Sequence, residues 1–438
     1  MKKKISAVLA AAILVLSMAG CNNNGSQSGS DTSVENTENK SASSYPTWNG
    51  IDRNKVIAYV EGADSEKFDI TFGDFYSEYL YYLVSYNIDD DMSATYKDAC
   101  EGYRENIITY LTFEHIFLEI AEEMGCGKSS LTDEEKETIQ ENIKATTDNF
   151  ISNYTSLASE ELGEGASDDD ILNRSTEMLV ADLARAELTM DIFEKWETNS
   201  FIQEKLTAEL NKGITVTEAD IDAMFEEYVA MAKTAFETNK VEYETNSTFT
   251  WIYKPEGTRL ADQILVAFDS DTQAKIQEAR TAGNDAEADK LREEAYNAEM
   301  QDKVKNIMYL IEAGNDFNTL QETYNDDGGN DPYPVVVGSQ IYVSEFTDAV
   351  FSVDNIGDVA EPAVSDYGVH IIKYEGDAVV TEQDMIEIRA SMSEFILEQK
   401  QSEVQQKAYN EWLERFPYTI DYDLLQVTVD ATEEDVLQ

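Results

Sequence analysis

The stretch GVHIIKY at residues 368–374 predicts a short β-strand that follows a turn at residues 366–368. Because side chains alternate between the two faces of a strand, we expect His370 to share one face with Ile372 and Tyr374. Upstream of this strand, three apolar residues recur at helical spacing: Phe346, Ala349 and Val350. The two patterns predict one helix packed on a sheet, which makes a small α/β unit.

Four short pieces of this region together resemble the parvulin family of peptidyl-prolyl isomerases. They are DFNTL at 316–320, YNDD at 324–327, EFTDAVF at 345–351 and GVHII at 368–372. The last piece is the most recognisable of the four, and RLADQILV at 259–266 is similar to the first strand of the family. The resemblance implies a four-stranded antiparallel sheet with flanking helices.

The resemblance also implies which residues form an active site. His370 matches one of the paired histidines of the family, Gln263 stands where the other is expected, and Asp327 falls at a central Cys or Asp position. The residues implied to be catalytic are therefore His370, Asp327, Gln263 and Ser365. Those implied to bind substrate are Phe346 of the proline pocket, Tyr342 at a position usually occupied by Met, Tyr367 and Ile372.

The chain differs from the family pattern in two places that affect catalysis. Gln263 replaces a histidine, although its amide can both donate and accept hydrogen bonds. The sequence NDPYP at 330–334 replaces a glycine-rich run, and its two prolines predict a different backbone course. Two interpretations stay open: an active isomerase, or a parvulin fold kept as a client-binding platform. In structural terms, His370 could be a packed core histidine and Asp327 a turn residue.

The first residues predict export and attachment to a membrane. Residues 1–20 have the pattern of a lipoprotein signal peptide, with three lysines before an apolar run that is short for a membrane span. Small residues before Cys21 resemble a bacterial lipobox, so we expect Cys21 to be lipidated; an ordinary cleaved signal is the alternative. Residues 21–52 are rich in Asn, Ser, Gly and Thr and predict a disordered tether. The expected location is the extracytoplasmic face of the cell membrane of a Gram-positive-like bacterium, with a lipid anchor.

A recurrent helix start organises much of the remaining chain. A Thr with an acidic residue three positions later is typical of a capping box and occurs at Thr71, Thr132, Thr217 and Thr381. We expect one helix from Thr132 to about residue 159 and one, capped by Ser167, that continues to about residue 196. A helical stretch is expected over about residues 271–313.

This order of elements resembles the secreted foldases of the PrsA and SurA kind, in which N-terminal helices and a C-terminal helix build a client-binding chaperone body. The implied fold class is α+β, with a mainly helical chaperone body and an inserted parvulin-like α/β domain. The expected divisions are a signal peptide (1–20), a tether (21–52), an N-terminal helical chaperone domain (53–250), a parvulin-like domain (251–377), a C-terminal helix and strand that complete the chaperone body (378–425), and a tail (426–438).

The composition excludes several classes of partner and site. The chain has 88 acidic residues against 32 Lys and Arg, a formal net charge of −56, so it repels nucleic acid and anionic membrane surfaces. Cys100 and Cys126 are expected to be buried thiols, because one continuous helix would separate them by roughly 35–40 Å, too far for a disulfide. Only two histidines are present and no zinc motif occurs. We therefore expect no metal and no cofactor.

These expectations combine into a function. The chain is expected to be a membrane-anchored extracytoplasmic foldase that binds unfolded secreted proteins and catalyses cis–trans isomerisation of X–Pro peptide bonds. Such catalysis needs no nucleophile, because the enzyme has only to bind the twisted amide better than the planar one. The alternatives are a holdase or adaptor without isomerase activity, and an acidic surface lipoprotein that binds a solute. A homodimer is one possible assembly.

Overall fold

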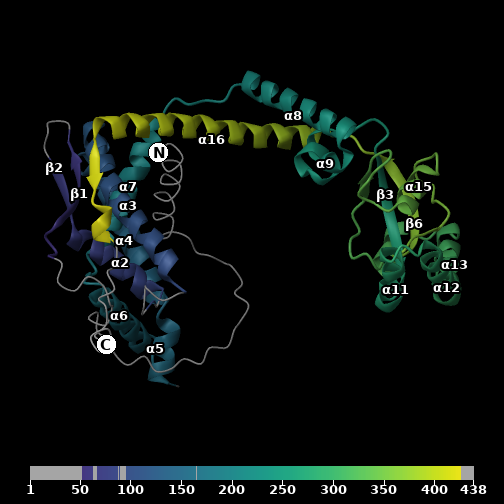
Figure 1. The fold of residues 1–438 in the computed structure, drawn as a ribbon, viewed down its shortest axis with the longest axis horizontal. Coiled ribbons are helices and arrows are strands. Elements are labelled where there is room, and N and C mark those ends of the chain that lie inside the picture. The colour runs from purple at the N-terminus through teal and green to yellow at the C-terminus, as the bar shows by residue number, and fades with distance from the viewer. Residues whose placement is uncertain (1–51, 63–66, 87, 89–94, 164, 426–438) are drawn as a thin grey trace, which may run out of the picture. The chain divides into compact units, whose positions relative to one another are not determined.

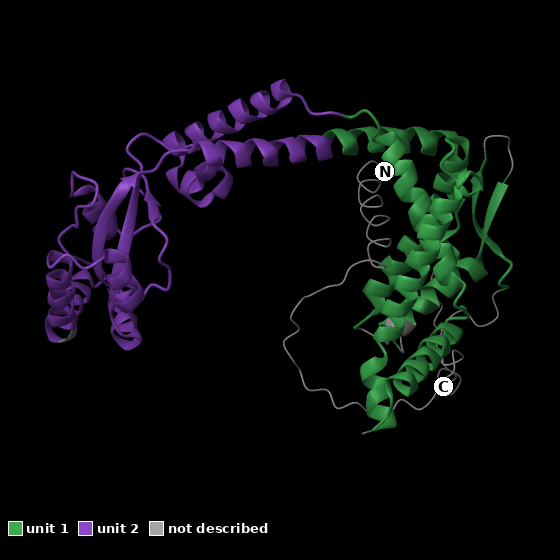
Figure 2. Cartoon of the chain, turned by 180° about the vertical axis from the view of Figure 1, so that it is seen from behind, with its two compact units in different colours: residues 1–214, 400–438 green, residues 215–399 purple. Residues whose placement is uncertain are grey.

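The computed structural model describes residues 52–62, 67–86, 88, 95–163 and 165–425. The chain divides into two compact units, residues 1–214 with 400–438 and residues 215–399 (Figure 2). The predicted signal peptide, the lipidated Cys21, almost all of the tether and the tail at 426–438 lie outside the described residues. Within the described residues, no helix is long and apolar enough to cross a membrane.

The first unit joins a small sheet to a group of helices (Figure 1). Its antiparallel sheet has the order β2-β1-β7, in which β1 (Val56–Glu61) pairs with β2 (Lys67–Thr71) and with β7 (Tyr418–Ile420). The helices are α2 (Phe72–Ser85), α3 (Lys97–Glu123), α4 (Asp133–Ser152), α5 (Thr155–Leu162), α6 (Asp168–Arg185) and α7 (Ile192–Leu210), with short 3₁₀ turns at Lys128–Ser130 and Tyr422–Leu425. Cys100 and Cys126 are both buried, as predicted.

The predicted capping patterns start helices as expected. Thr132 accepts a hydrogen bond from the backbone of Glu135, whose side chain accepts from the Thr132 N–H, and Thr217 forms the same pair with Asp220. At Thr381, the side chain of Asp384 accepts the backbone N–H at 2.8 Å. These reciprocal bonds satisfy backbone donors that the first helical turn leaves without partners, so the local sequence is enough to fix where these helices begin.

Two predicted helices are wrong in length. The helix expected from Thr132 to about residue 159 ends at Ser152, and Tyr154 donates a hydrogen bond to Asp182 of α6 before α5 begins. The helix expected to reach residue 196 ends at Arg185. There Glu187 has a φ of 60°, and the Leu188 N–H bonds to the Leu183 carbonyl at 2.8 Å. That is a helix-ending turn that Gly usually makes, so the hydrophobic period alone does not reveal it.

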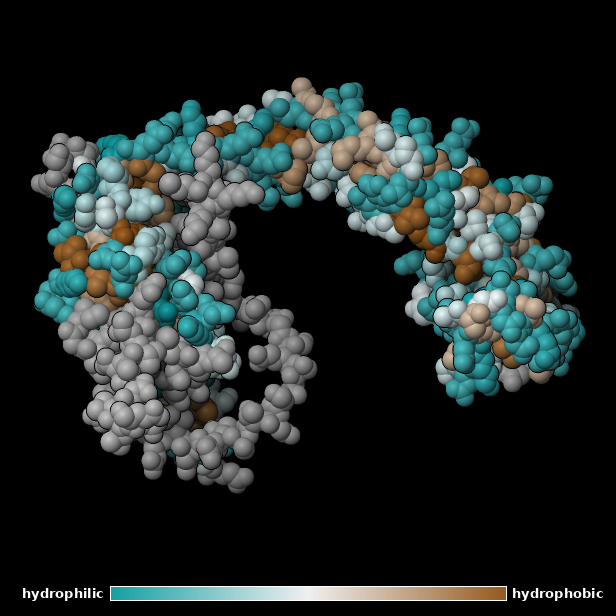
Figure 3. Space-filling model, in the orientation of Figure 1, coloured by the Kyte–Doolittle hydropathy of each residue, from teal (hydrophilic) through white to brown (hydrophobic). Residues whose placement is uncertain are grey.

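The second unit has a helical part and an α/β module. The helical part comprises α8 (Glu218–Thr238), α9 (Lys240–Thr245), α10 (Ser247–Ile252) and the beginning of α16 (Glu382–Arg415), the helix whose last residues belong to the first unit. Apolar residues of these helices share one core, which includes Tyr243, Phe249 and Ile388. Figure 3 shows that the visible face of each unit is mostly hydrophilic, with hydrophobic residues in smaller patches.

The α/β module spans residues 258–378, and its ends meet where the Ala378 N–H donates to the Thr258 carbonyl at 2.8 Å. Its antiparallel sheet has the order β4-β3-β6-β5, from β3 (Arg259–Ala267), β4 (Tyr333–Val335), β5 (Ala363–Val364) and β6 (Gly368–Asp377). The helices are α11 (Ser270–Thr281), α12 (Asp285–Ala295), a π-helical turn (Tyr296–Met300), α13 (Gln301–Glu312), α14 (Phe317–Tyr324) and α15 (Ser344–Phe351). The helical stretch expected over 271–313 is therefore several segments, and the first break comes at Gly283, which has a φ of 70°.

The sheet of the α/β module has a separate apolar core on each face. One face packs Ile264 and Ile371 with Ile307 of α13 and Phe317 of α14. The other face packs Ala261 and Ile372 with Phe346 and Val350 of α15. The alternation of side chains along β3 and β6 thus divides the residues between two layers of helix. The predicted fold class, a mainly helical α+β chain with a four-stranded antiparallel sheet, is confirmed.

Candidate active site

The strands β3 and β6 place two polar side chains on one face of the sheet. Gln263 pairs with Ile372, and Leu265 pairs with His370, in the antiparallel register. Gln263 and His370 are therefore diagonal neighbours on the same face, close enough for long side chains to meet. Both side chains are buried, and Gln263 Oε1 lies 2.7 Å from His370 Nδ1.

A turn after α14 carries Asp327 and is fixed by hydrogen bonds to the backbone of β3. Asn325 Oδ1 accepts the Leu265 N–H at 2.9 Å, and the Asp326 N–H donates to the Leu265 carbonyl at 2.8 Å. Asp326 Oδ2 accepts the Ala267 N–H at 3.0 Å. Because the turn pairs with the strand in this way, the adjacent Asp327 has a fixed place beside the sheet.

A continuous chain of hydrogen bonds then crosses the site. Ser365 Oγ lies 2.7 Å from His370 Nε2, and the other imidazole nitrogen reaches Gln263. Gln263 Nε2 donates to Asp327 Oδ2 at 2.7 Å, and the Tyr333 hydroxyl donates to the same oxygen at 2.6 Å. Asp327 thus receives two hydrogen bonds on one carboxylate oxygen at the exposed end of a chain that begins in the buried interior.

The direction of every bond in this chain follows from the carboxylate. An ionised Asp327 only accepts, so Gln263 presents its NH₂ group to it and its carbonyl oxygen to His370. The Nδ1 of His370 must then carry the proton, and in the neutral ring Nε2 accepts from the Ser365 hydroxyl. Ser365 Oγ in turn accepts the Tyr367 N–H at 3.1 Å. All of these protons therefore point toward Asp327.

Burial keeps His370 neutral. Removal from water is the main effect and lowers the pKa of His370 to about 4, while the negative charges of Asp327 and Glu345 act in the opposite direction. At neutral pH the ring is therefore uncharged, as the hydrogen-bond directions above require. A neutral imidazole with one donor and one acceptor is the form that can link Ser365 to Gln263.

The titration of His370 provides a direct check. We expect a pKa of about 4, and since the ordinary value is 6.5, the unfolded chain takes up the proton first as the pH falls. The contribution of His370 to the free energy of unfolding is greatest above about pH 6.5. It falls by about 3 kcal/mol as the pH drops to about 4. NMR of histidine-labelled protein measures this pKa, and His115→Gln leaves His370 as the single imidazole. A midpoint near 6.5 for His370 would contradict the buried network.

Aromatic rings form an apolar cluster, the Phe346 cluster, beside the polar chain. Phe346 is buried, and its ring centroid lies 5.2 Å from Tyr342, 5.9 Å from Tyr333 and 5.8 Å from His370. Ile372 is buried in the same core. Burial, with the nearby negative charge of Glu244 as a smaller cause, raises the pKa of Tyr342, so its hydroxyl stays neutral.

The structure brings the polar residues of the predicted site into one hydrogen-bonded chain beside the Phe346 cluster. Tyr367 differs from the others, because its side chain is 52% exposed and it joins the chain through its backbone N–H. Tyr333 was missed. It lies in NDPYP, where residues 333–335 form the edge strand β4 and Pro334, which lacks an N–H, stands opposite Leu260. The replaced glycine-rich run was the available signal, but the sequence alone does not show that Tyr333 reaches Asp327.

Variants of Gln263 can show whether its two hydrogen bonds matter or only its size. Gln263→Leu leaves the His370 Nδ1–H without its acceptor in a buried place, at a cost of about 1–3 kcal/mol. If the chain of bonds supports catalysis, isomerase activity in a proline-limited refolding assay should fall about tenfold or more. Gln263→His is the matched variant, because an imidazole both donates and accepts, and it should retain most of the activity. Equal activity in the Leu variant and the wild type would contradict a role for the chain.

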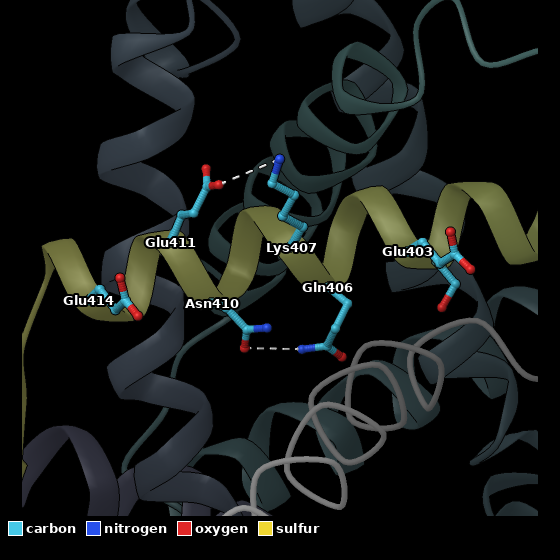
Figure 4. A pocket seen from close by; sticks show the side chains of 7 residues that line it. Glu403, Gln406, Lys407, Asn410, Glu411 and Glu414 are labelled. Carbon is cyan, nitrogen blue, oxygen red and sulfur yellow. Dashed lines mark hydrogen bonds and ion pairs between the residues drawn. The ribbon is translucent and has the colours of Figure 1, made fainter.

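The last part of α16 carries no comparable group of buried, interacting polar side chains. A polar depression there is lined by residues of this one helix, and Lys407 pairs with Glu411 at 3.9 Å while Gln406 donates to Asn410 at 3.4 Å (Figure 4). Side chains paired along one exposed helix face form a solvated surface. Among the residues that the structure describes, no group of three or more His, Cys, Asp or Glu side chains is placed to hold a metal ion.

The chain is similar to several known proteins. The family model of the PPIC-type PPIase domain, a rotamase, matches residues 264–376. The foldase protein PrsA of Caldanaerobacter subterraneus subsp. tengcongensis is 25% identical over 245 residues, which cover 53% of this chain and 73% of that protein. Among solved structures, PrsA from Bacillus subtilis is 17% identical with a TM-score of 0.21, covering 88% of this chain and 97% of its own. PrsA from Bacillus anthracis is 16% identical with a TM-score of 0.17, covering 49% and 95%.

The matched residues contain His370, Asp327, Ser365 and Phe346, and the match begins one residue after Gln263. The chain therefore contains a PPIC-type parvulin rotamase domain and is a distant homologue of the foldase PrsA.

Proposed function

We propose that this protein is a membrane-anchored extracytoplasmic foldase that binds unfolded secreted proteins and catalyses the cis–trans isomerisation of X–Pro peptide bonds. The observation that carries the proposal is the unbroken chain of hydrogen bonds from Ser365 to Asp327 beside the Phe346 cluster. In this proposal the aromatic cluster provides apolar surface for the proline ring, and the chain holds the Asp327 carboxylate beside it.

The chemistry follows from the amide bond itself. Resonance between the nitrogen and the carbonyl gives rotation a barrier of about 18–20 kcal/mol. Phe346, Tyr342 and Tyr333 bind the proline ring and exclude water from the carbonyl, which disfavours its charge-separated form. The Asp327 carboxylate, held by Gln263 and Tyr333, opposes the same charge separation by repelling a negative carbonyl oxygen. Both effects destabilise the planar amide relative to the twisted one, which is the condition for catalysis.

The helical parts of the chain supply the client-binding function in this proposal. They are the predicted chaperone domain at 53–250 and its completion at 378–425. In the second unit, these helices expose apolar side chains: Met231 is 47% exposed, Ile386 64% and Phe395 45%. Such residues offer contact area to an unfolded chain. The predicted lipidation of Cys21 would hold the foldase at the membrane, where secreted proteins emerge.

The experiment is a proline-limited refolding reaction with protein that lacks residues 1–46. We expect the slow phase to become faster in proportion to the enzyme added, and Asp327→Ala or His370→Ala to reduce this acceleration while the protein stays folded. Aggregation of an unfolded client is measured in parallel. No acceleration by the wild type, with aggregation still suppressed, would overturn the isomerase proposal in favour of a holdase that keeps the parvulin fold.

A further inference from the structure

Two arginines of the α11–α12 hairpin contact the turn at Asp366, and one of them also contacts the start of α15. Arg280 of α11 donates to both carboxylate oxygens of Asp366, from Nε at 2.8 Å and from Nη2 at 3.0 Å. Asp366 lies between Ser365, which ends the hydrogen-bonded chain, and Tyr367, which donates to Ser365. Arg280 therefore binds the turn that carries Ser365, the buried end of the polar chain.

The second arginine reaches the helix that carries the proline pocket. Arg292 Nη1 donates to Glu345 Oε1 at 2.7 Å and lies 3.5 Å from Asp366 Oδ1. Glu345 directly precedes Phe346 at the start of α15. One guanidinium thus lies between the turn that holds Ser365 and the helix that holds Phe346.

Further contacts fix the arginines to their own hairpin. Arg280 Nη2 lies 2.6 Å from Asp289 Oδ1, and Arg292 Nη2 lies 3.3 Å from the same oxygen. The two arginine side chains are only 25% and 23% exposed. A planar guanidinium with several fixed donors holds its carboxylate partners in a defined geometry, which a lysine ammonium does not.

The same network is electrically coupled to the imidazole of the site. The charge of Glu345 is one of the two that raise the pKa of His370 against the larger effect of burial. Arg292 places a positive charge directly on Glu345 and so weakens the negative field at the ring. The pKa of His370 therefore reports on the contact between α12 and α15, and no substrate is needed to measure it.

We propose that Arg280 and Arg292 are positioning residues that fix the distance between the Ser365 turn and the Phe346 helix, and so set the width of the prolyl site. The proposal rests on the proposed isomerase function and assigns to the α11–α12 hairpin the task of holding two walls of the site together. A site of this kind loses activity when its walls shift by roughly 0.5 Å, because pocket and polar groups must act on one amide.

The test compares Arg292→Gln with Lys290→Gln in the full chain. Lys290 is on the same helix and pairs with Glu287 at 3.9 Å and Glu294 at 3.7 Å, so its replacement removes the same charge without touching the site. We expect Arg292→Gln to lower kcat/KM about fivefold and to raise the pKa of His370, whereas Lys290→Gln changes neither. Glu345→Gln should lower the His370 pKa and, in the double variant with Arg292→Gln, abolish the increase.

A second pair of variants tests the contact between Arg280 and Asp366 of the turn. Arg280→Gln should change the ¹⁵N shift of His370 Nε2, because the Ser365 hydroxyl loses its fixed position, and Arg280→Lys should restore this shift only in part. If Arg280→Gln and Arg292→Gln both match Lys290→Gln in the His370 spectrum, the proposal is overturned. If the spectrum responds as expected while the wild type catalyses no isomerisation, the proposed function fails and the positioning contacts stand.

Discussion

Gly368→Ala is expected to destabilise the α/β module by roughly 4 kcal/mol or more. Gly368 begins β6 with a φ of 150°, a conformation that L residues with a side chain rarely adopt. An added Cβ would collide with the carbonyl oxygen of Val266 and lie 2.7 Å from the Cα of Ala267. Both atoms belong to the backbone of the paired strand β3, so neither can move without disturbing the register that makes Gln263 and His370 diagonal neighbours.

Gly376→Ala is the matched control, because it isolates backbone strain from collision. Gly376 lies on the same strand with a φ of 152°, but an added Cβ would meet only Ile356 Cδ1 at 4.0 Å. Its cost should be limited to about 1–3 kcal/mol of strain. Hydrogen exchange of the β3 and β6 amides measures the free energy of opening for both variants. Similar losses in the two would contradict the close approach of the strands at Gly368.

Phe346→Ala should have the largest combined effect on stability and activity. Truncating a buried phenylalanine costs about 3–5 kcal/mol, and here it also removes the ring that contacts Tyr342, Tyr333 and His370. We expect a strongly destabilised module, measured by denaturant unfolding, and the loss of isomerase activity. The remaining activity should be at least about a hundredfold lower, because both the pocket and its support are lost.

Phe346→Leu separates the two effects of the alanine variant. A leucine nearly conserves the apolar volume, so the module should lose less than about 1.5 kcal/mol and stay folded. The aromatic contacts are absent, which predicts a fall in activity of about two- to tenfold. Full activity in a folded Phe346→Ala protein would show that the proline ring binds elsewhere.

Part of the α/β module and several helix starts elsewhere could be predicted from local pattern. Alternation places His370 and Ile372 on one face of a strand, and in the structure both lie on the face that α15 covers. The capping residues at Thr132 and Thr217 fix helix starts because their partners are three positions away. In each case the determining interactions lie within a few residues, so the sequence contains them directly.

Features that depend on distant contacts could not be predicted. Tyr154 donates to Asp182, which is 28 positions away, and one predicted helix ends just before it. Arg280 meets Asp366 across 86 positions, and the helical stretch expected over about residues 271–313 gives no sign of this contact. Tyr333 is six positions from Asp327, but its hydroxyl reaches the carboxylate only because β4 pairs with β3. Pairing of this kind is set by the fold as a whole.

The most direct test of the central claim is the rate of cis–trans exchange in a short proline peptide, measured by NMR exchange spectroscopy with and without the protein. This measurement sees the amide rotation itself and is blind to holdase activity, since a short peptide neither folds nor aggregates. Uncatalysed isomerisation takes tens of seconds or more, and we predict that the protein makes the exchange much faster. The Asp327→Asn variant should give clearly slower exchange at unchanged stability. Peptide exchange at the uncatalysed rate in the presence of folded wild-type protein would contradict the proposed isomerase activity.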